Sequence, residues 1–123
     1  MTIMERRVDT DERTPASQVR ARPSAVVWIN GRVATVVCKD ADGQEATWTI
    51  ERGVEPELAY LAGVVRAIGD RERVMILGPG SERLALEREY VAIRRRPERL
   101  VDVEPSGPLA EADLIERLRL LAA

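Results

Sequence analysis

The pattern of apolar and polar residues first becomes regular at residue 25. Residues 25–29 and 33–38 are nearly unbroken apolar runs rich in β-branched side chains, and residues 45–51 alternate apolar with polar positions. The first pattern is typical of buried strands, and the second of a strand with one solvent-exposed face. Asn30 and Gly31 separate the first two runs, and Asn-Gly is a common sequence for a type I′ hairpin turn. The pattern therefore predicts a three-stranded antiparallel meander.

A helical period replaces this alternation after the meander. Apolar residues recur every three or four positions in three stretches, which run from about Glu55 to Ile68, from Ser81 to about Arg95, and from residues 106–108 onward. This spacing places apolar side chains on one face of a helix. Ser81 is expected to cap the second helix, which Pro97 ends. Two short apolar runs, 74–77 and 100–103, follow the first and second helices and predict two further strands.

The predicted order of elements is β-β-β-α-β-α-β-α. Three antiparallel strands followed by alternating helices and parallel strands are typical of the ribonuclease H-like fold, an α/β (α+β) architecture with a five-stranded mixed sheet. Right-handed crossovers give the spatial strand order 3-2-1-4-5, with the first predicted strand in the centre. At 123 residues the chain is long enough for one ordinary domain, which we assign to residues 25–123.

Residues 1–24 carry no apolar period. They contain Pro15 and Pro23 and mix five arginines with four acidic residues. Segments of this composition bury little apolar surface. We therefore expect a flexible N-terminal tail, and its nearly balanced charge makes it a poor nucleic-acid arm. Because these residues also lack the apolar stretch of a secretory signal, and no run approaches the ~18 residues of a membrane span, the expected location is the cytoplasm, with no membrane partner.

The composition excludes most catalytic chemistry. The chain has no histidine and a single cysteine, Cys38, so it has neither a Ser-His-Asp arrangement nor an intrachain disulfide. A ribonuclease H-type nuclease needs carboxylates on its first and fourth strands to bind two metal ions, and the runs 25–29 and 74–77 carry none. We therefore expect no enzyme, no cofactor and no metal site.

The loop after residues 74–77 is the first candidate site. Gly78, Gly80 and Ser81 precede a predicted helix, where backbone N–H groups and the helix dipole favour anions. Pro79 between the glycines removes one donor, and the chain lacks both a P-loop and a third glycine, since Arg83 stands at that position. We favour a strand-to-helix turn that needs unusual φ angles, with anion binding as the alternative.

The second candidate site is a concentration of arginine around the second predicted helix. Between residues 83 and 99 there are six arginines and three glutamates. The arginines are Arg83, Arg88, Arg94, Arg95, Arg96 and Arg99. Such clusters are typical of RNA or acidic-protein contacts, although a solvated helix end explains them as well. The formal net charge of −2 argues against broad, nonspecific nucleic-acid binding.

The third candidate site is the strand over residues 45–51, which the predicted order places at a sheet edge. Ala46, Trp48 and Ile50 share one face of this strand. An exposed edge strand can pair with another chain. The strand therefore predicts a protein-interaction surface, for a partner protein or for a second copy.

Three segments of the sequence resemble one protein family. They are Val27-Trp28-Ile29 with Arg32-Val33-Ala34, Ile76-Leu77-Gly78-Pro79-Gly80, and Leu100-Val101-Asp102-Val103-Glu104 followed by Gly107. Through them the span from Val26 to Leu121 resembles the middle domain of archaeal and eukaryotic class-1 peptide chain release factors and the related ribosome-rescue factors. It is still more similar to small bacterial stand-alone proteins that share this domain. The resemblance implies the translational-machinery-component form of the ribonuclease H-like fold.

The resemblance also limits the expected function. In release factors a Gly-Gly-Gln loop between the third strand and the first helix enters the peptidyl-transferase centre, whereas residues 51–56 here read Glu-Arg-Gly-Val-Glu-Pro. Peptide release is therefore not implied. The resemblance implies a non-catalytic, translation-related protein that binds the ribosome or RNA. The residues leave open an alternative, a protein-interaction or homo-oligomerisation module that uses the edge strand.

Overall fold

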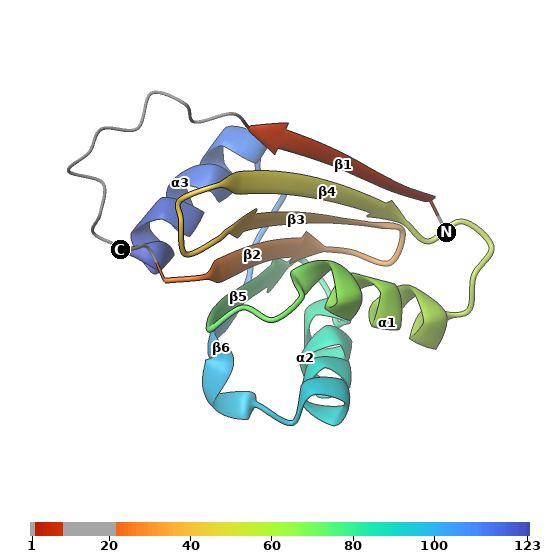
Figure 1. Cartoon of the computed structure of the whole chain (residues 1–123). Coiled ribbons are helices and arrows are strands. Elements are labelled where there is room, and N and C mark those ends of the chain that lie inside the picture. Colours follow the sequence, from red (N-terminus) through yellow and green to blue (C-terminus); the bar gives the residue numbers. More distant parts are fainter. Residues whose placement is uncertain (1, 9–21) are drawn as a thin grey trace.

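The chain folds around a six-stranded mixed sheet that carries three α-helices (Figure 1). The computed structural model describes residues 2–8 and 22–123, and within residues 2–8 it describes the side chain of Ile3 alone. The strands are β1 (Thr2–Val8), β2 (Ser24–Ile29), β3 (Val33–Lys39), β4 (Glu45–Glu51), β5 (Arg73–Gly78) and β6 (Leu100–Pro105). The helices are α1 (Glu57–Ile68), α2 (Glu82–Arg94), the 3₁₀ turn η2 (Pro97–Arg99) and α3 (Glu111–Ala122).

The five predicted strands are confirmed, in the predicted spatial order β4-β3-β2-β5-β6. β2 pairs antiparallel with β3 and parallel with β5, and β5 pairs parallel with β6. β2 therefore has a neighbour on each side. Its apolar sequence fits burial on both faces, since Ala25, Val26 and Val27 are each 0% exposed.

Helices cover both faces of this sheet. α1 and α2 pack on one face, where Val27 and the ring of Tyr60 belong to one buried cluster. α3 packs on the other face, where Val26, Leu77 and Leu118 form a second cluster. Successive side chains of a strand point to opposite faces, so the neighbouring residues Val26 and Val27 serve different cores. The sheet is thus the middle layer of three.

The N-terminal residues correct the expectation of a flexible tail over residues 1–24. Thr2–Val8 form β1, which pairs antiparallel with β4 along its whole length. The sequence did not indicate this strand, because its pairing uses backbone N–H and C=O groups and so requires no periodic pattern of apolar side chains. Residues 9–21 lie outside the described residues. Residues 24–123 hold the rest of the sheet and all the helices that the structure describes.

β1 also corrects the position predicted for β4. The strand that carries Ala46, Trp48 and Ile50 was expected at a sheet edge, but its outer side is occupied by β1. Trp48 and Ile50 also pack on the core formed with α1 and α2, and Ile50 is 0% exposed. Strand addition at β4 therefore requires β1 to leave first.

The opposite edge of the sheet, β6, has irregular geometry. Val74 pairs with Leu100 and Met75 with Asp102, so Val101 is the extra residue of a β-bulge. The Asp102 carboxylate accepts a hydrogen bond from the N–H of Val103 at 2.9 Å. A hydrogen bond with Asp102 and its negative charge raise the pKa of Glu104 two residues further on. Pro105, which has no N–H, ends the strand.

The turn between β2 and β3 differs from the predicted type I′ geometry. Neither Asn30 nor Gly31 has a positive φ, although that turn requires it at both central residues. The Asn30 side chain closes the turn instead, because its Oδ1 accepts hydrogen bonds from the N–H groups of Arg32 at 2.8 Å and Val33 at 2.9 Å. An asparagine side chain that bonds the backbone two residues later is an alternative to the left-handed turn.

The helix limits also differ in part from the prediction. The Ser81 side chain forms no capping hydrogen bond. α2 ends at Arg94, and Arg95 follows in a left-handed conformation with φ of 57°. α3 begins at Glu111, later than expected, because the segment before it is tied to the sheet: Trp28 Nε1–H donates to the carbonyl oxygen of Gly107 at 2.9 Å.

A buried carboxylate at the first residue of β4 forms an ion pair with α3. Glu45 is 4% exposed and accepts hydrogen bonds from Arg119 Nε at 3.0 Å and Nη2 at 3.1 Å, with Lys39 Nζ at 3.6 Å. Burial alone would raise the pKa of this carboxyl. The hydrogen bond from Arg119 and the positive charges of Arg119 and Lys39 outweigh burial and hold the pKa below its ordinary value.

Replacement of this carboxylate should therefore destabilise the chain. We expect Glu45→Gln to lower the free energy of unfolding at pH 7 by about 1–2 kcal/mol, because it removes the ion pair with Arg119. The loss is no larger because Arg119 is partly exposed, so solvent screens the pair. A carboxyl with a lowered folded-state pKa stabilises above its unfolded pKa, near ~4.3, and that contribution disappears as pH falls. Urea unfolding at pH 7 and pH 3.5 should show a smaller acid-induced loss in Glu45→Gln. An equal loss in both proteins would contradict this assignment.

Candidate functional site

The carboxyl end of the sheet is where the sequence placed the glycine-loop site. β2, β4, β5 and β6 run in the same direction and all end there, and α1 and α2 begin there. Ligands of α/β proteins usually dock at this end. Four connections meet at it, namely residues 30–32, 52–56, 79–81 and 106–110.

Gly78 ends β5 in close contact with β2. A Cβ at Gly78 would lie 2.2 Å from the carbonyl oxygen of Ile29. The carbonyl oxygen of Gly78 accepts a hydrogen bond from the N–H of Ser106 at 2.9 Å, which ties in the loop after β6. Neither Gly78 nor Gly80 has a positive φ. The expectation of unusual φ angles is therefore wrong, and Gly78 is needed because two backbones approach closely.

The anion-binding alternative for Gly78, Gly80 and Ser81 meets a carboxylate. A Cβ at Gly80 would lie 2.9 Å from Oε1 of Glu82, and a Cβ at Gly31 would lie 3.4 Å from Oε2 of the same side chain. Glu82 thus lies between the two loops and places a negative charge beside the first N–H groups of α2. An anion would have to displace this side chain, so the loop is a poor anion site in this conformation.

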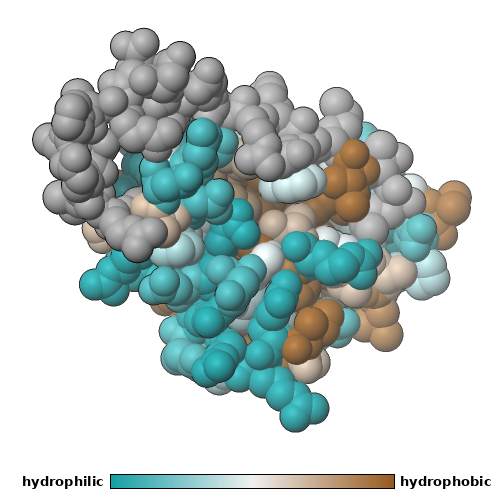
Figure 2. Space-filling view, in the orientation of Figure 1, coloured by the Kyte–Doolittle hydropathy of each residue, from teal (hydrophilic) through white to brown (hydrophobic). Residues whose placement is uncertain are grey.

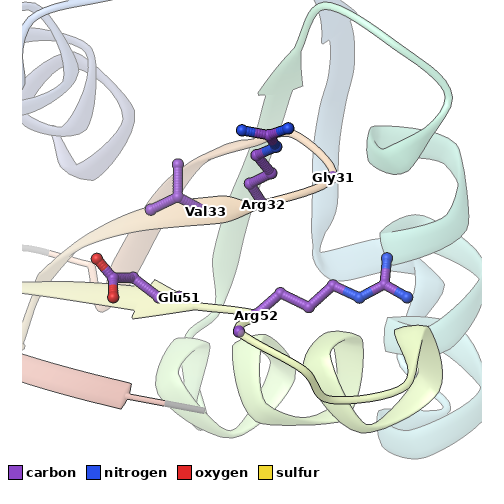
Figure 3. A pocket seen from close by; sticks show the side chains of 6 residues that line it. Gly31, Arg32, Val33, Glu51 and Arg52 are labelled. Carbon is purple, nitrogen blue, oxygen red and sulfur yellow. The ribbon is translucent and has the colours of Figure 1, made fainter.

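An open hollow of about 360 Å³ lies between the β2–β3 loop and the β4–α1 loop (Figure 3). Arg32, Glu51 and Arg52 contribute to its walls, but their side chains point in different directions and do not converge on one ligand. Arg52 instead fixes its own loop. Its Nε–H donates to the carbonyl oxygen of Glu55 at 2.9 Å. Its backbone N–H donates to the carbonyl oxygen of Arg32 at 2.8 Å.

The β4–α1 loop and the first turn of α1 expose large apolar side chains beside this hollow. Val54 is fully exposed and Leu58 is 66% exposed. Hydrophobic residues gather toward the right of Figure 2, where Figure 1 has this loop and α1. Nearby, the Tyr60 hydroxyl donates to the carbonyl oxygen of Asn30 at 3.0 Å, and burial raises the pKa of that hydroxyl. The exposed Val54 and Leu58 side chains make this surface suited to contact with another molecule.

The six arginines predicted as one basic surface are spread along α2 and the segment after it, from Arg83 in the first turn of α2 to Arg99 in η2. Arg83 lies in the first turn, where it donates to the carbonyl oxygen of Gly80. Arg94 ends the helix, roughly 17 Å away at the helical rise per residue. Arg94 is only half exposed. Proximity in sequence therefore does not become a single patch in space.

At the C-terminal end of α2, some of these arginines already have partners. Arg99 donates to the carboxylate of Asp70 and, at 3.4 Å, to the carbonyl oxygen of Arg71. The hydrogen bond from Arg99 holds the pKa of Asp70 below its ordinary value. Arg96 lies 3.8 Å from a carboxylate oxygen of Glu98. These contacts leave less positive charge for an external anion than the sequence indicated.

Arg88 and Arg95 are the exposed members of the cluster that have no acidic partner among the described residues, whereas Arg96 is exposed but lies beside Glu98. Arg88 lies within α2, and Arg95 follows the last residue of α2 in a left-handed conformation. Neither side chain forms a hydrogen bond or ion pair with another residue in the part of the chain that the structure describes. No local pattern in the sequence separates this pair from the other four arginines.

The remaining chemistry-bearing groups form no site. Cys38 is buried, and burial raises the pKa of its thiol to about 11, so the thiol stays protonated at neutral pH. Among the side chains that the structure describes, no group of three or more His, Cys, Asp or Glu could hold a metal ion. The described helices are all too short or too polar to cross a membrane.

Two solved structures share this architecture. The Pelota protein of Thermoplasma acidophilum matches with a TM-score of 0.60 and 20% identity, over 83% of this chain and 33% of that protein. Pelota of Archaeoglobus fulgidus matches with a TM-score of 0.59 and 15% identity, over 85% of this chain and 33% of that protein. The chain has a Pelota-like fold. No protein-family model matches it, and no curated protein sequence does so either.

The Pelota likeness concerns the fold, since the identities are low, and the chain spans about a third of either Pelota. The mixed sheet with three helices is consistent with the middle-domain fold of Pelota and of release factors. The fold implied by the sequence resemblance is therefore confirmed.

The close approach at Gly78 is testable against a second glycine of the same Pelota-like fold. Gly78→Ala should lower the free energy of unfolding by about 2–4 kcal/mol, because its Cβ cannot fit beside the Ile29 carbonyl without separating β2 from β5. Gly107→Ala is the matched control, since a Cβ there meets nothing within 4 Å, and it should change stability by less than about 0.5 kcal/mol. Equal effects in urea unfolding would show that β5 can shift.

Proposed function

We propose that the chain is a non-catalytic, translation-related binding domain that contacts ribosomal RNA through two exposed arginines, Arg88 in α2 and Arg95 directly after it. The observation that carries this proposal is the Pelota-like fold over 83% of the chain. The sequence resemblance to release-factor middle domains covers nearly the same span and supports the same assignment. The proposed role also requires the cytoplasm as the place of action.

The β4–α1 loop is the reason for proposing binding without peptide release. In release factors this connection carries the Gly-Gly-Gln loop, whereas here it is a short closed turn. The N–H of Glu55 donates to the carbonyl oxygen of Arg52 at 3.1 Å, and the Arg52 side chain donates back to Glu55. Gly53 supplies the positive φ of 59° that this turn needs. No residue of the turn can reproduce a glutamine at a loop tip.

Arg88 and Arg95 are the residues that best support an RNA contact. Guanidinium groups bind phosphate through two parallel N–H donors, and these two are exposed without an ion pair to any described residue. Arg96 and Arg99 already have acidic partners. The contact we propose is therefore smaller than a six-arginine surface, which agrees with the slightly negative net charge of the chain.

Substitution of this pair should weaken binding to ribosomes. We expect Arg88→Gln with Arg95→Gln to reduce cosedimentation with ribosomes of the source organism several-fold at low salt. Each lost phosphate contact should also flatten the plot of log affinity against log salt concentration by about one unit. The measurement is sedimentation of the full chain with purified ribosomes across a salt series.

A matched control separates this site from general charge effects. Arg22→Gln with Arg66→Gln removes the same charge from two arginines that are also exposed, and it should leave ribosome binding and its salt dependence unchanged. Equal loss of ribosome binding in both double variants would show that the effect comes from the change in net charge. Cosedimentation of the Arg88/Arg95 variant at the level of the unaltered chain would refute the proposed contact.

A further inference from the structure

β1 is attached to the rest of the molecule by a single neighbour. It pairs with β4 from Thr2 opposite Glu51 to Val8 opposite Glu45, and β4 is its only extensive contact among the described elements. In Figure 1 it lies at the rim of the sheet, while α1 and α2 pack under the strands nearer the centre. The described attachment of β1 to the sheet is therefore its backbone pairing with β4.

The inward side of β1 leaves a space unfilled. A hollow of about 250 Å³ lies between β1, β4 and α1, with walls that include Ile3, Trp48 and Ala67. Ile3 is 45% exposed, whereas its cross-strand partner Ile50 is 0% exposed. A side chain beside a void loses the dispersion contacts that packing would provide. β1 therefore has one neighbouring strand and a void at its described side chain, and edge elements of this kind open before the rest of a fold.

β4 is supported independently of β1. It pairs along its whole length with β3, Ile50 is buried in the core, and Glu45 is fastened to Arg119. When β1 opens, β4 should thus remain in place and present an unpaired strand edge. Such an edge accepts an extended segment through main-chain hydrogen bonds, while pockets for alternate side chains give specificity.

The hollow beside this edge indicates what kind of segment fits. The position of Ile3 leads into the unfilled space, where a larger apolar side chain would gain contacts. Two residues later, the position of Glu5 lies opposite Trp48, which shares the hollow with the exposed Arg66. Arg66 has no ion pair with a described residue, whereas Arg71 beside it already pairs with Asp40 at 3.0 Å.

We propose that the edge of β4 is a strand-acceptor site that β1 covers reversibly, and that it binds an extended segment of a partner protein. The segment carries a bulky apolar residue at the Ile3 position and an acidic residue two positions later, within reach of Arg66. The site lies at the edge of the sheet opposite β6 and does not depend on the proposed ribosome contact. Binding competes with β1, so the apparent affinity equals the intrinsic affinity multiplied by the fraction of molecules in which β1 is open.

Peptides in the register of β1 test this site on the full chain. The probes are fluorescein-labelled peptides with the sequence of residues 2–8, unaltered or with Ile3→Phe, Ile3→Ser or Glu5→Gln. In fluorescence anisotropy we expect Ile3→Phe to bind about five-fold more tightly than the unaltered peptide, because it buries more apolar surface. Ile3→Ser and Glu5→Gln should each bind more weakly. Failure of the Ile3→Phe peptide to bind, or equal affinity of all four, would overturn the proposal.

A reversible lock on β1 tests the competition. Met4 and Thr49 are direct cross-strand partners, so their Cα atoms lie within disulfide range. The chain with Met4→Cys and Thr49→Cys should lose binding of the Ile3→Phe peptide when oxidised and regain it in dithiothreitol. Cys38 is buried and protonated and should not interfere. Equal binding by the oxidised and reduced proteins would place the peptide elsewhere and refute the site.

Two further readouts complete the test. Hydrogen exchange should show faster exchange of the β1 amides than of the β3 and β4 amides, and equal protection would contradict a detachable β1. Light scattering over a concentration series should show a monomer in both lock states. A dimer that forms only in the reduced state would assign the β4 edge to a second copy of the chain and overturn the proposal of a different partner.

Discussion

The rest of the structure depends on the close parallel pairing of β2 with β5. That pairing sets the antiparallel meander beside the parallel strands, and it brings the carboxyl ends of both strands to the edge from which α2 starts. It is tight enough that the carbonyl of Ile29 occupies the space of a Cβ at Gly78. Both faces of β2 are then closed, one by α1 and α2 and the other by α3. A chain without aromatic-rich packing thereby obtains two aliphatic cores from one central strand.

The elements that the sequence predicted are those whose stability comes from buried side chains. Residues 25–29 and 74–77 are apolar on both faces, and that composition is visible without a structure. β1 was missed because its pairing partner is a backbone edge and its own sequence includes Glu5, Arg6 and Arg7. The Asn30 turn was misjudged for a similar reason, since a side-chain hydrogen bond replaced the backbone conformation that Asn-Gly usually indicates.

The candidate sites were harder to predict than the fold, because each depends on groups distant in sequence. Asp70 accepts a hydrogen bond from Arg99, 29 residues away in the sequence. No local sequence pattern indicates this pair. The Glu82 carboxylate lies against both Gly31 and Gly80. It therefore occupies the place beside the start of α2 where the glycine loop would otherwise bind an anion. What remains of the arginine cluster is the exposed pair without an acidic partner among the described residues, Arg88 and Arg95. The number of charges was readable from the sequence, whereas their partners were not.

The two edges of the sheet differ in a way that bears on how the chain can assemble. A filament of strands joined head to tail needs two receptive edges in every subunit. β6 offers a bulge at Val101, an N–H already held by the Asp102 carboxylate, and a proline at its end, all of which oppose strand addition. Whatever joins at β4 therefore cannot be continued through β6 of the same molecule. If a segment joins at β4 as we propose, this asymmetry limits strand addition to one guest segment for each chain.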